Sequence, residues 1–171
     1  AEQETRILTD ANGRDVELHQ EIQRAVVSNR YNLEIIRAIG AIDQVEAIDS
    51  LAYTNEAFWP EFTADDVYGK GTRDLDYEKI ISYNPDVFIV LPGQYSDEIA
   101  EKLGDYDIPV FVLNCASGQT VEEYNGQIEL CADIFGKEEG AQKVIDFCSS
   151  IRNEVAERLK DMPEDDRVNV Y

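Results

Sequence analysis

NPDVFIVLPG, residues 84–93, is the stretch that decides the fold class of this 171-residue chain. A residue that precedes proline avoids the helical region, so Asn84-Pro85 ends the helix that the preceding residues predict. Residues 86–91 then form a nearly continuous apolar run, which is typical of a strand whose two faces are both buried. Such a strand predicts a parallel sheet covered by helices on both sides.

Similar short runs lie on both sides of this strand. Further strands are predicted at 24–28, 44–49 and 109–114, and helices at 33–39, 75–83, 96–103, 120–135 and 137–159. Asn12-Gly13 between two extended arms predicts an antiparallel hairpin over residues 5–18, and residues 50–73 are expected to form a loop. The alternation of strands and helices predicts an α/β fold, a three-layer α/β/α lobe with a mainly parallel sheet.

The chain divides into three parts by pattern. Residues 1–136 are expected to form one lobe, and residues 137–161 a long helix, of roughly 34 Å at 1.5 Å per residue. Residues 162–171 contain a linker and the start of one more strand. A long helix that leads into an unfinished strand predicts a second lobe beyond it.

Charge excludes one class of partner. The chain has 15 basic and 36 acidic residues and a net charge of -21, whereas nucleic-acid binding needs clustered lysine and arginine. No run approaches the roughly 18 apolar residues of a membrane span. The three cysteines, Cys115, Cys131 and Cys148, have no zinc-binding spacing, although one disulfide between two of them stays open.

Motifs for catalysis are missing. The sequence has no GxGxxG, phosphate-loop or GxSxG pattern, and its one histidine, His19, follows the hairpin and precedes the first core strand. We therefore expect no enzyme and no cofactor. A small hydrolase that uses paired carboxylates is one alternative. A lobe that binds a bare metal ion is another, although such sites favour several histidines.

The candidate site lies where the strands end, because ligands of open α/β sheets bind outside the carboxyl ends of the strands. Aromatic, amide, hydroxyl and guanidinium groups gather there, which suits a bulky ligand held by stacking and a few hydrogen bonds. The candidate ligand-binding residues are Asn29, Arg30, Tyr31, Tyr53, Trp59, Arg73, Gln94, Tyr95, Asn114 and Ser117. The aromatic residues have the alternative of packing at the edge of the core, and Arg30 that of pairing with a neighbouring carboxylate.

Several short motifs, each weak alone, follow one another in a specific order along nearly the whole chain. They are ILTDANGRDVEL at 7–18, RAVVS at 24–28, a helix ending at IGA, LDYEKI at 75–80, NPDVFI at 84–89 and IPV at 108–110. This order resembles the solute-binding proteins that serve ABC importers of ferric siderophores, cobalamin and haem. The chain departs from that pattern at His19, where proline is frequent, and at residues 65–73, which are acidic and aromatic rather than glycine-rich.

The resemblance implies the amino-terminal lobe of a monomeric, two-lobed protein outside the cytoplasm, after removal of a leader or with a lipid anchor. Its ligand would be an iron chelate or a corrinoid, bound between the lobes, and its partner an ABC permease dimer in the membrane. Each lobe would dock on the permease through a surface carboxylate, and in this lobe that position matches Glu78. A charge-assisted pair with permease arginines would then set the register of docking.

Overall fold

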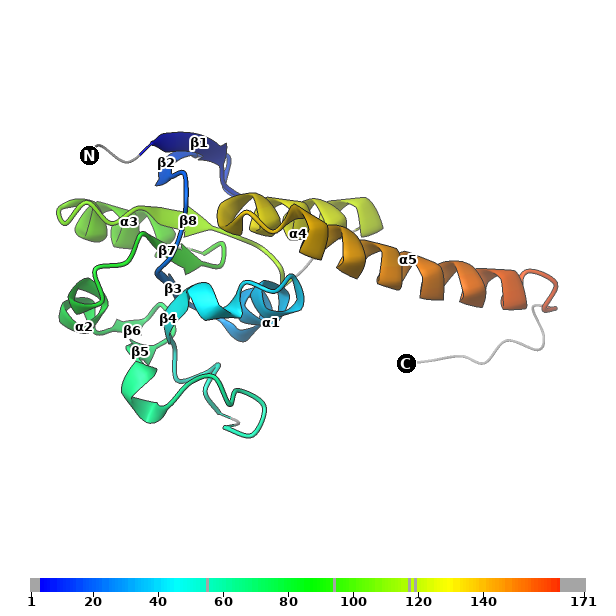
Figure 1. Ribbon diagram of the computed structural model, residues 1–171, viewed down its shortest axis with the longest axis horizontal. Helices are drawn as coiled ribbons and strands as arrows, with labels where there is room; N and C mark the ends of the chain where they lie inside the picture. Colours follow the sequence, from blue (N-terminus) through cyan, green and yellow to red (C-terminus); the bar gives the residue numbers. More distant parts are fainter. Residues whose placement is uncertain (1–3, 55, 94, 117, 119, 164–171) are drawn as a thin grey trace.

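A computed structural model describes residues 4–54, 56–93, 95–116, 118 and 120–163 (Figure 1). At its centre is a parallel four-stranded sheet in the order β4-β3-β7-β8. Its strands are β3 (Ala25–Val27), β4 (Val45–Ile48), β7 (Val87–Val90) and β8 (Val110–Val112). The parallel sheet expected around residues 86–91 is confirmed.

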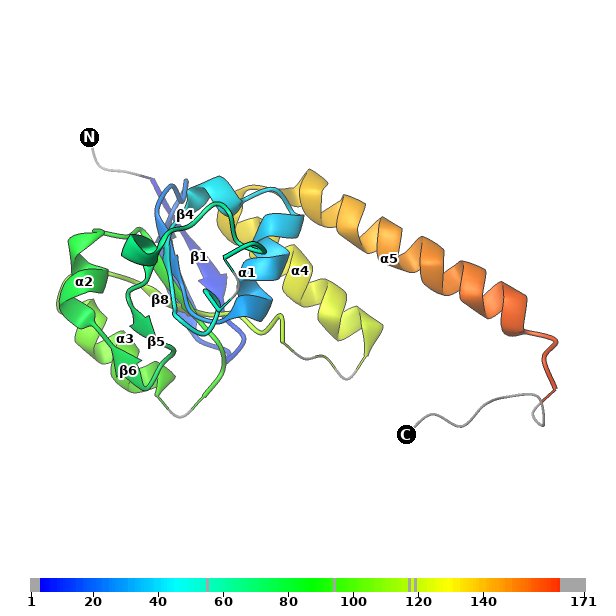
Figure 2. The same cartoon turned by 90° about the horizontal axis from the view of Figure 1, so that it is seen from below.

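Helices cover both faces of this sheet. In Figure 2, α1 and α4 lie on one side of it, and α2 and α3 lie on the other. The helices are α1 (Arg30–Ala38), α2 (Tyr77–Ser82), α3 (Ser96–Gly104), α4 (Val121–Phe135) and α5 (Glu138–Leu159), with short 3-10 turns η1 (Ile42–Gln44) and η2 (Ala64–Asp66). The predicted α/β fold class is therefore confirmed.

Alternate strand residues build two separate cores. Val27 and Ile89 pack with Leu33 of α1 on one face. Val26 and Phe88 pack with α2 and α3 on the other. Full burial of such a side chain stabilises the fold by about 1.5–3 kcal/mol, so the two cores together fix which helix lies on which face.

The strand order places a topological switch point inside the sheet. From β3 the chain goes to β4 on one side, and then crosses to β7 on the other side of β3. Connections from β3 and β7 therefore leave in opposite directions at their carboxyl ends. A crevice forms at such a point and is the usual ligand site of open α/β sheets.

Two antiparallel hairpins flank the sheet. The predicted amino-terminal hairpin consists of β1 (Thr5–Thr9) and β2 (Asp15–His19). A second one, β5 (Gly69–Lys70) with β6 (Asp74–Leu75), lies in the segment that the sequence predicted to be a loop. Strands of two residues are too short to produce an alternating pattern, which explains why the sequence did not indicate them.

Helix α5 leaves the body of the molecule. Near its start Gly140 lies against the end of α1, where an added Cβ would meet the Ile39 carbonyl oxygen at 2.0 Å. Farther along, Phe147, Ile151 and Val155 are exposed at intervals of four residues, and Figure 1 shows this part of the helix extending beyond the other elements. The strand start expected within residues 164–171 lies outside the described residues.

Candidate functional site

A cleft of about 220 Å³, lined by polar and apolar residues, opens at the switch point. The loops after β3, β4 and β7 and the segment 71–72 contribute to it. We call it the switch-point cleft; it is lined by Ser28, Asn29, Asp49, Leu51, Gly71, Thr72, Leu91, Pro92, Gly93, Tyr95 and Ser96. Two of the predicted ligand residues, Asn29 and Tyr95, line it directly.

A buried carboxylate holds one wall of the switch-point cleft. Asp49, which is 1% exposed, follows β4 and accepts hydrogen bonds from the backbone N–H of Asn29 at 2.7 Å and of Ala52 at 2.8 Å. The Ser28 hydroxyl donates to the same carboxylate at 3.3 Å. Asp49 thereby ties the turn between β3 and α1 to the end of the neighbouring strand.

That turn has an uncommon backbone. Asn29 has a φ of 91°, a region that residues other than glycine rarely adopt and that persists only where surrounding contacts impose it. Its side-chain oxygen accepts from the Tyr31 N–H at 2.9 Å and caps α1, while its own N–H is bound by Asp49. The first turn of α1 is consequently presented at the edge of the cleft.

The amino terminus of α1 is a positive spot on an acidic protein. The first turn of every other α-helix in the described ranges carries at least one acidic residue, whereas the first turn of α1 carries none. Arg30 begins this helix, is exposed, and stacks 4.9 Å from the centroid of the Tyr31 ring. The helix dipole and the guanidinium both favour an anion at this position.

A second hollow of about 230 Å³ adjoins the switch-point cleft, since Thr72 and Tyr95 line both. Arg73 and Lys102 bring cations to it, and Asp74 and Glu98 bring carboxylates. The Lys102 ammonium pairs with Glu98 at 2.7 Å, which leaves Arg73 as the cation of this hollow without an ion pair among the described residues. The Lys102 ammonium lies 5.1 Å from the centroid of the Tyr77 ring. The structure thus groups Asn29, Tyr95 and Arg73 around adjoining hollows, with Arg30 and Tyr31 on the neighbouring helix turn.

Trp59 is not available to a ligand in this structure. It is 2% exposed, and the Arg37 guanidinium lies 3.8 Å from its ring centroid while also pairing with Glu61 at 2.5 Å. The ring packs edge-on against Phe58. An aromatic residue in a loop looks the same in sequence whether its face is open or covered, so the expectation of a stacking surface was wrong for Trp59.

Other predicted residues stand farther from the cleft. Tyr53 is half-buried against the α1 core, and burial, followed by the nearby Glu56 and Asp66 carboxylates, raises its pKa. Asn114 follows β8, and its N–H donates to the Gln127 side chain at 2.9 Å. Two predicted residues, Gln94 and Ser117, lie outside the described residues.

Glu78 lies apart from the switch-point cleft. It is exposed in the first turn of α2 and lines an open hollow of about 710 Å³, together with Lys70, Asp76 and Lys79. The Lys79 ammonium is held by the Val67 carbonyl at 2.7 Å. The exposed Glu78 therefore lies outside the switch-point cleft, although its hollow shares Asp74, Leu75 and Tyr77 with the hollow that Arg73 lines.

Sequence reasoning missed the residues that support the cleft. Asn32 is fully buried; its amide donates to the Leu113 carbonyl at 2.9 Å and its oxygen accepts from the Cys115 N–H at 3.1 Å. It joins α1 to the end of β8. One signal was present, because an amide on the apolar face of a predicted helix must find buried partners. Gly71 and Thr72 had no comparable signal, since they come from the predicted loop.

The remaining reactive groups lie elsewhere or are covered. Cys115 and Cys131 are buried free thiols, and burial, followed by the neighbouring Cys115 thiol, raises the pKa of Cys131 well above its usual value. His19 lines a hollow with Ile108 and Pro109, which precede β8, and so lies toward the opposite end of that strand from the cleft. Within the described residues, no three His, Cys, Asp or Glu side chains gather as a metal site requires.

Tyr68 is buried next to Ser28 and Asp49, two residues of the switch-point cleft. Burial, followed by the Asp49 carboxylate, raises its pKa well above the usual value, so its hydroxyl stays protonated. A covered phenol and a carboxylate occupied by backbone donors do not make an exposed acid–base pair. The lobe carries cations and hydrogen-bonding groups around a crevice at the strand ends, an arrangement that can bind a ligand.

Comparison with known proteins gives this binding lobe a family. Residues 25–171 match the family model described as periplasmic binding protein. The chain belongs to the periplasmic binding protein family, which confirms the resemblance drawn from the order of its motifs.

Individual relatives span a range of ligands. The chain is 26% identical to the molybdate-binding protein MolA of Haemophilus influenzae over 97% of its own length and 53% of that protein. The solved structure of MolA bound to molybdate has a TM-score of 0.79 at 24% identity, covering 95% of this chain and 56% of that one. The petrobactin-binding protein YclQ of Bacillus subtilis has a TM-score of 0.71 at 18% identity, covering 92% and 55%. The haem-binding protein HmuT has a TM-score of 0.68 at 18% identity, covering 96% and 52%. The chain therefore spans about half the length of the relatives that it matches.

Proposed function

We propose that this protein captures an anionic metal species outside the cytoplasm and delivers it to the permease of an ABC importer. The ligand would be an iron chelate, such as a ferric siderophore or haem, or a metal oxyanion such as molybdate. The observation that carries the proposal is the switch-point cleft beside the acid-free amino terminus of α1. Family membership supports a role in binding and transport.

Charge is the argument for an anion. A chain of net charge -21 repels anions at long range, so a site for one must supply cations locally. Arg73 does so in the hollow that adjoins the switch-point cleft, Arg30 does so on the first turn of α1 beside it, and the dipole of α1 adds a partial positive charge. The ligands named for two relatives also support an anionic ligand, because molybdate is an oxyanion and haem carries carboxylates. A corrinoid is not among the ligands named for the relatives above, so this expectation is not carried into the proposal.

Two lobes are part of the proposal. The switch-point cleft, at about 220 Å³, is smaller than the sites that enclose most of a bulky chelate, so a second wall is needed. The exposed apolar stripe of α5, formed by Phe147, Ile151, Val155 and Leu159, is the kind of surface that another domain covers. Residues 1–136 would form one lobe, residues 137–161 the connecting helix, and residues 162–171 the entry into the other. The roughly doubled length of the relatives supports this division.

Docking on the permease would use Glu78, which is exposed away from the cleft. Because Glu78 lines neither the switch-point cleft nor the hollow of Arg73, a loaded protein could dock through it without opening the ligand site. The partner would be a permease dimer that meets a monomeric binding protein. A location outside the cytoplasm follows from the family. None of the helices in the described part of the chain has the length and apolarity to cross a bilayer.

The experiment that tests the proposal is a thermal-shift screen of the full-length protein. Molybdate, tungstate, haem and ferric catecholate siderophores form the panel of anionic metal species, with sulfate, metal-free siderophores and uncharged ferric hydroxamates as controls. A bound ligand at one hundred times its Kd raises the free energy of unfolding by about 2.7 kcal/mol, which is several degrees in melting temperature. A shift with one anionic metal species supports the proposal, and no shift with any of them contradicts it.

A further inference from the structure

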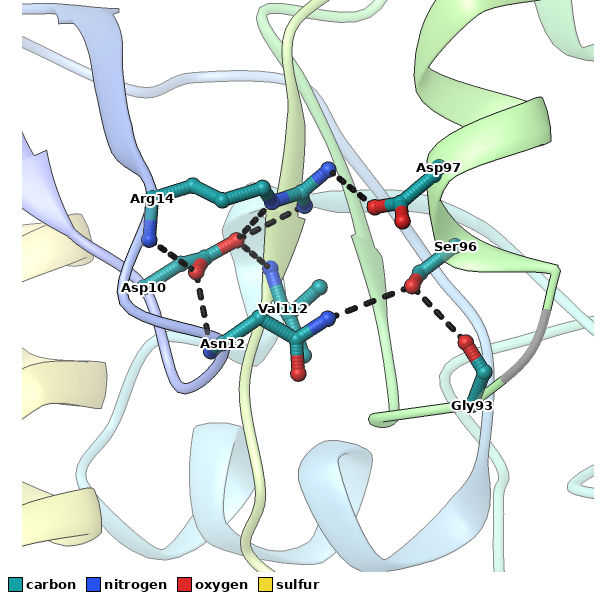
Figure 3. A network of polar contacts seen from close by, with 7 residues as sticks. All are labelled: Asp10, Asn12, Arg14, Gly93, Ser96, Asp97 and Val112. Atoms are coloured by element: carbon teal, nitrogen blue, oxygen red, sulfur yellow. Dashed lines mark hydrogen bonds and ion pairs between the residues drawn. The ribbon is translucent and has the colours of Figure 1, made fainter.

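The turn of the amino-terminal hairpin, residues 10–14, lies beside the loop that closes one side of the switch-point cleft. Figure 3 shows Asp10, Asn12 and Arg14 directed toward β8 and toward the start of α3. In sequence this turn is 84 residues from its partner Ser96. Its contacts give it a fixed place relative to the cleft.

Asp10 shapes the turn from within. Its side chain is completely buried and accepts from the backbone N–H of Asn12 at 2.9 Å and of Arg14 at 3.0 Å. The Arg14 guanidinium donates to the other oxygen through Nε at 2.9 Å and Nη2 at 2.7 Å. Charge-assisted bonds of this kind are the strong ones, so the turn has one well-defined conformation.

The turn is also fastened to the edge of the sheet. The Ala11 N–H donates to the Val112 carbonyl at 2.8 Å, and the Val112 N–H donates to the Asp10 carboxylate at 3.3 Å. Val112 is the last residue of β8, the edge strand. The hairpin turn therefore moves with the end of the sheet at which the cleft opens.

From this position Asn12 reaches the wall of the cleft. Its amide nitrogen donates to the Ser96 hydroxyl at 3.2 Å, and that hydroxyl donates to the Gly93 carbonyl at 2.8 Å. A hydroxyl can donate one hydrogen bond and accept others, so Ser96 can donate to Gly93 and accept from Asn12 at the same time. Ser96 and Gly93 both line the switch-point cleft. The nearby pair of Arg14 with Asp97, at 3.2 Å, is solvent-exposed at the Asp97 end and adds little alone.

We infer that Asn12 and Ser96 are positioning residues for the ligand: through them the hairpin turn sets where the loop residues Gly93 and Ser96 stand, and so the width of the switch-point cleft. The inference rests on the proposed function for its consequence in binding, whereas its structural part concerns this loop alone. Nothing else about the hairpin requires an amide at position 12 to face Ser96, since the turn itself is held by Asp10.

The test compares three variants of the full-length protein: Asn12→Ala, Ser96→Ala and the control Thr9→Val. Thr9 donates to Asp15 across the same hairpin at 2.8 Å, an exposed side-chain bond that does not reach the loop. Hydrogen exchange of the amides of residues 95–97 reports on the loop, and calorimetric titration with molybdate and with haem reports on binding. The melting temperature of each variant shows that the fold is retained.

Asn12→Ala and Ser96→Ala are each expected to speed exchange at residues 95–97 by about three- to tenfold, the effect of one lost hydrogen bond. They should weaken binding of the probe that the parent binds by a similar factor, while Thr9→Val changes neither quantity. Unchanged exchange in both variants overturns the inference, and so does faster exchange with unchanged affinity. If neither of these probes nor a ferric catecholate siderophore binds the parent, the ligand class named under the proposed function fails, while the exchange rates still decide whether the turn holds the loop.

Discussion

The carboxylate of Asp49 accepts a 2.7 Å hydrogen bond from the backbone N–H of Asn29, and so joins the ends of β4 and β3 at the switch point. Asn29 could not keep a φ of 91° without such a partner. The orientation of α1, and with it the positive spot at the cleft, depends on a residue that no ligand needs to touch.

Replacing Asp49 with asparagine tests this dependence. The amide keeps one acceptor oxygen but turns an NH₂ group toward backbone donors, which leaves at least one buried N–H without a partner. We expect a loss of about 1–3 kcal/mol in the free energy of unfolding, measured by urea titration. Ligand affinity should fall as well. Asp43→Asn, at an exposed position in η1, is the matched control and should change neither. A fully stable Asp49→Asn protein would contradict the role given to this carboxylate.

Two glycines in neighbouring helices should respond to alanine in opposite directions. In α5 a Cβ at position 140 would stand 2.0 Å from the Ile39 carbonyl oxygen, so Gly140→Ala must push α5 away from α1. We expect it to cost about 1–3 kcal/mol in unfolding free energy, as overpacking does. In α4 a Cβ at Gly126 meets nothing within 4 Å, so Gly126→Ala should stabilise the protein by roughly 0.5–1 kcal/mol. Equal effects at the two positions would show that α5 is not seated as described.

Stability at low pH should depend on Asp86. Burial alone would raise the pKa of this carboxyl, but hydrogen bonds from the Gln23 N–H and from the backbone and side chain of Arg24 prevail and lower it. A lowered pKa in the folded state gives stability that is present above the unfolded value, near 3.9, and is lost as the pH falls through the folded pKa.

Asp86→Asn should therefore be less stable than the parent at pH 7, by about 1–3 kcal/mol. The difference in stability should shrink as the pH falls below about 4. The parent then loses the stabilisation by the ionised Asp86 carboxylate, which the variant lacks at every pH. Urea unfolding at a series of pH values measures it. Asp161→Asn, at an exposed site after α5, should leave the pH profile as it is. A difference that stays constant down to low pH would mean that the ionised form of Asp86 is not the stabilising one.

Substitution of Glu78 should impair docking on the permease without changing ligand affinity. Charge reversal in Glu78→Lys places a cation where permease arginines would meet it, and we expect uptake of the ligand to fall about tenfold or more. The affinity for the ligand should not change, since Glu78 lies outside the switch-point cleft. Glu129→Lys, an exposed reversal on α4, is the control for net charge. Loss of ligand affinity in Glu78→Lys with unaltered docking would overturn its assignment.

The fold was predictable because its signals are local. Apolar runs such as residues 86–91 have one structural meaning, and Asn12-Gly13 specifies its own hairpin. The site was only partly predictable, because its walls come from segments far apart in the sequence. Asn29 and Tyr95 lie in the segments that follow β3 and β7, where the rule about strand ends places candidates, whereas Asp49, directly after β4, was not among the candidate residues.

Trp59, in contrast, was predicted as a ligand-binding residue but is buried in the structure. Its position after β4 made it a candidate for stacking, and only packing revealed that Arg37 already covers its ring. Burial of a loop aromatic depends on which distant helix it meets. Likewise, the bond between Asn12 and Ser96 joins residues 84 apart, and no pattern of spacing in the sequence indicates it.

The most direct test of the account is the dissociation constant of the ligand found in the thermal-shift screen, measured by calorimetry for the parent and for Arg30→Gln/Arg73→Gln. These substitutions remove the cations beside the cleft and keep side chains of similar length, and Arg152→Gln on the exposed part of α5 is the control. If the protein binds an anionic metal species at the switch-point cleft, the double variant should bind at least tenfold more weakly, the worth of one or more charge-assisted hydrogen bonds. The control should bind like the parent. Equal affinity in the double variant and the parent would contradict the account.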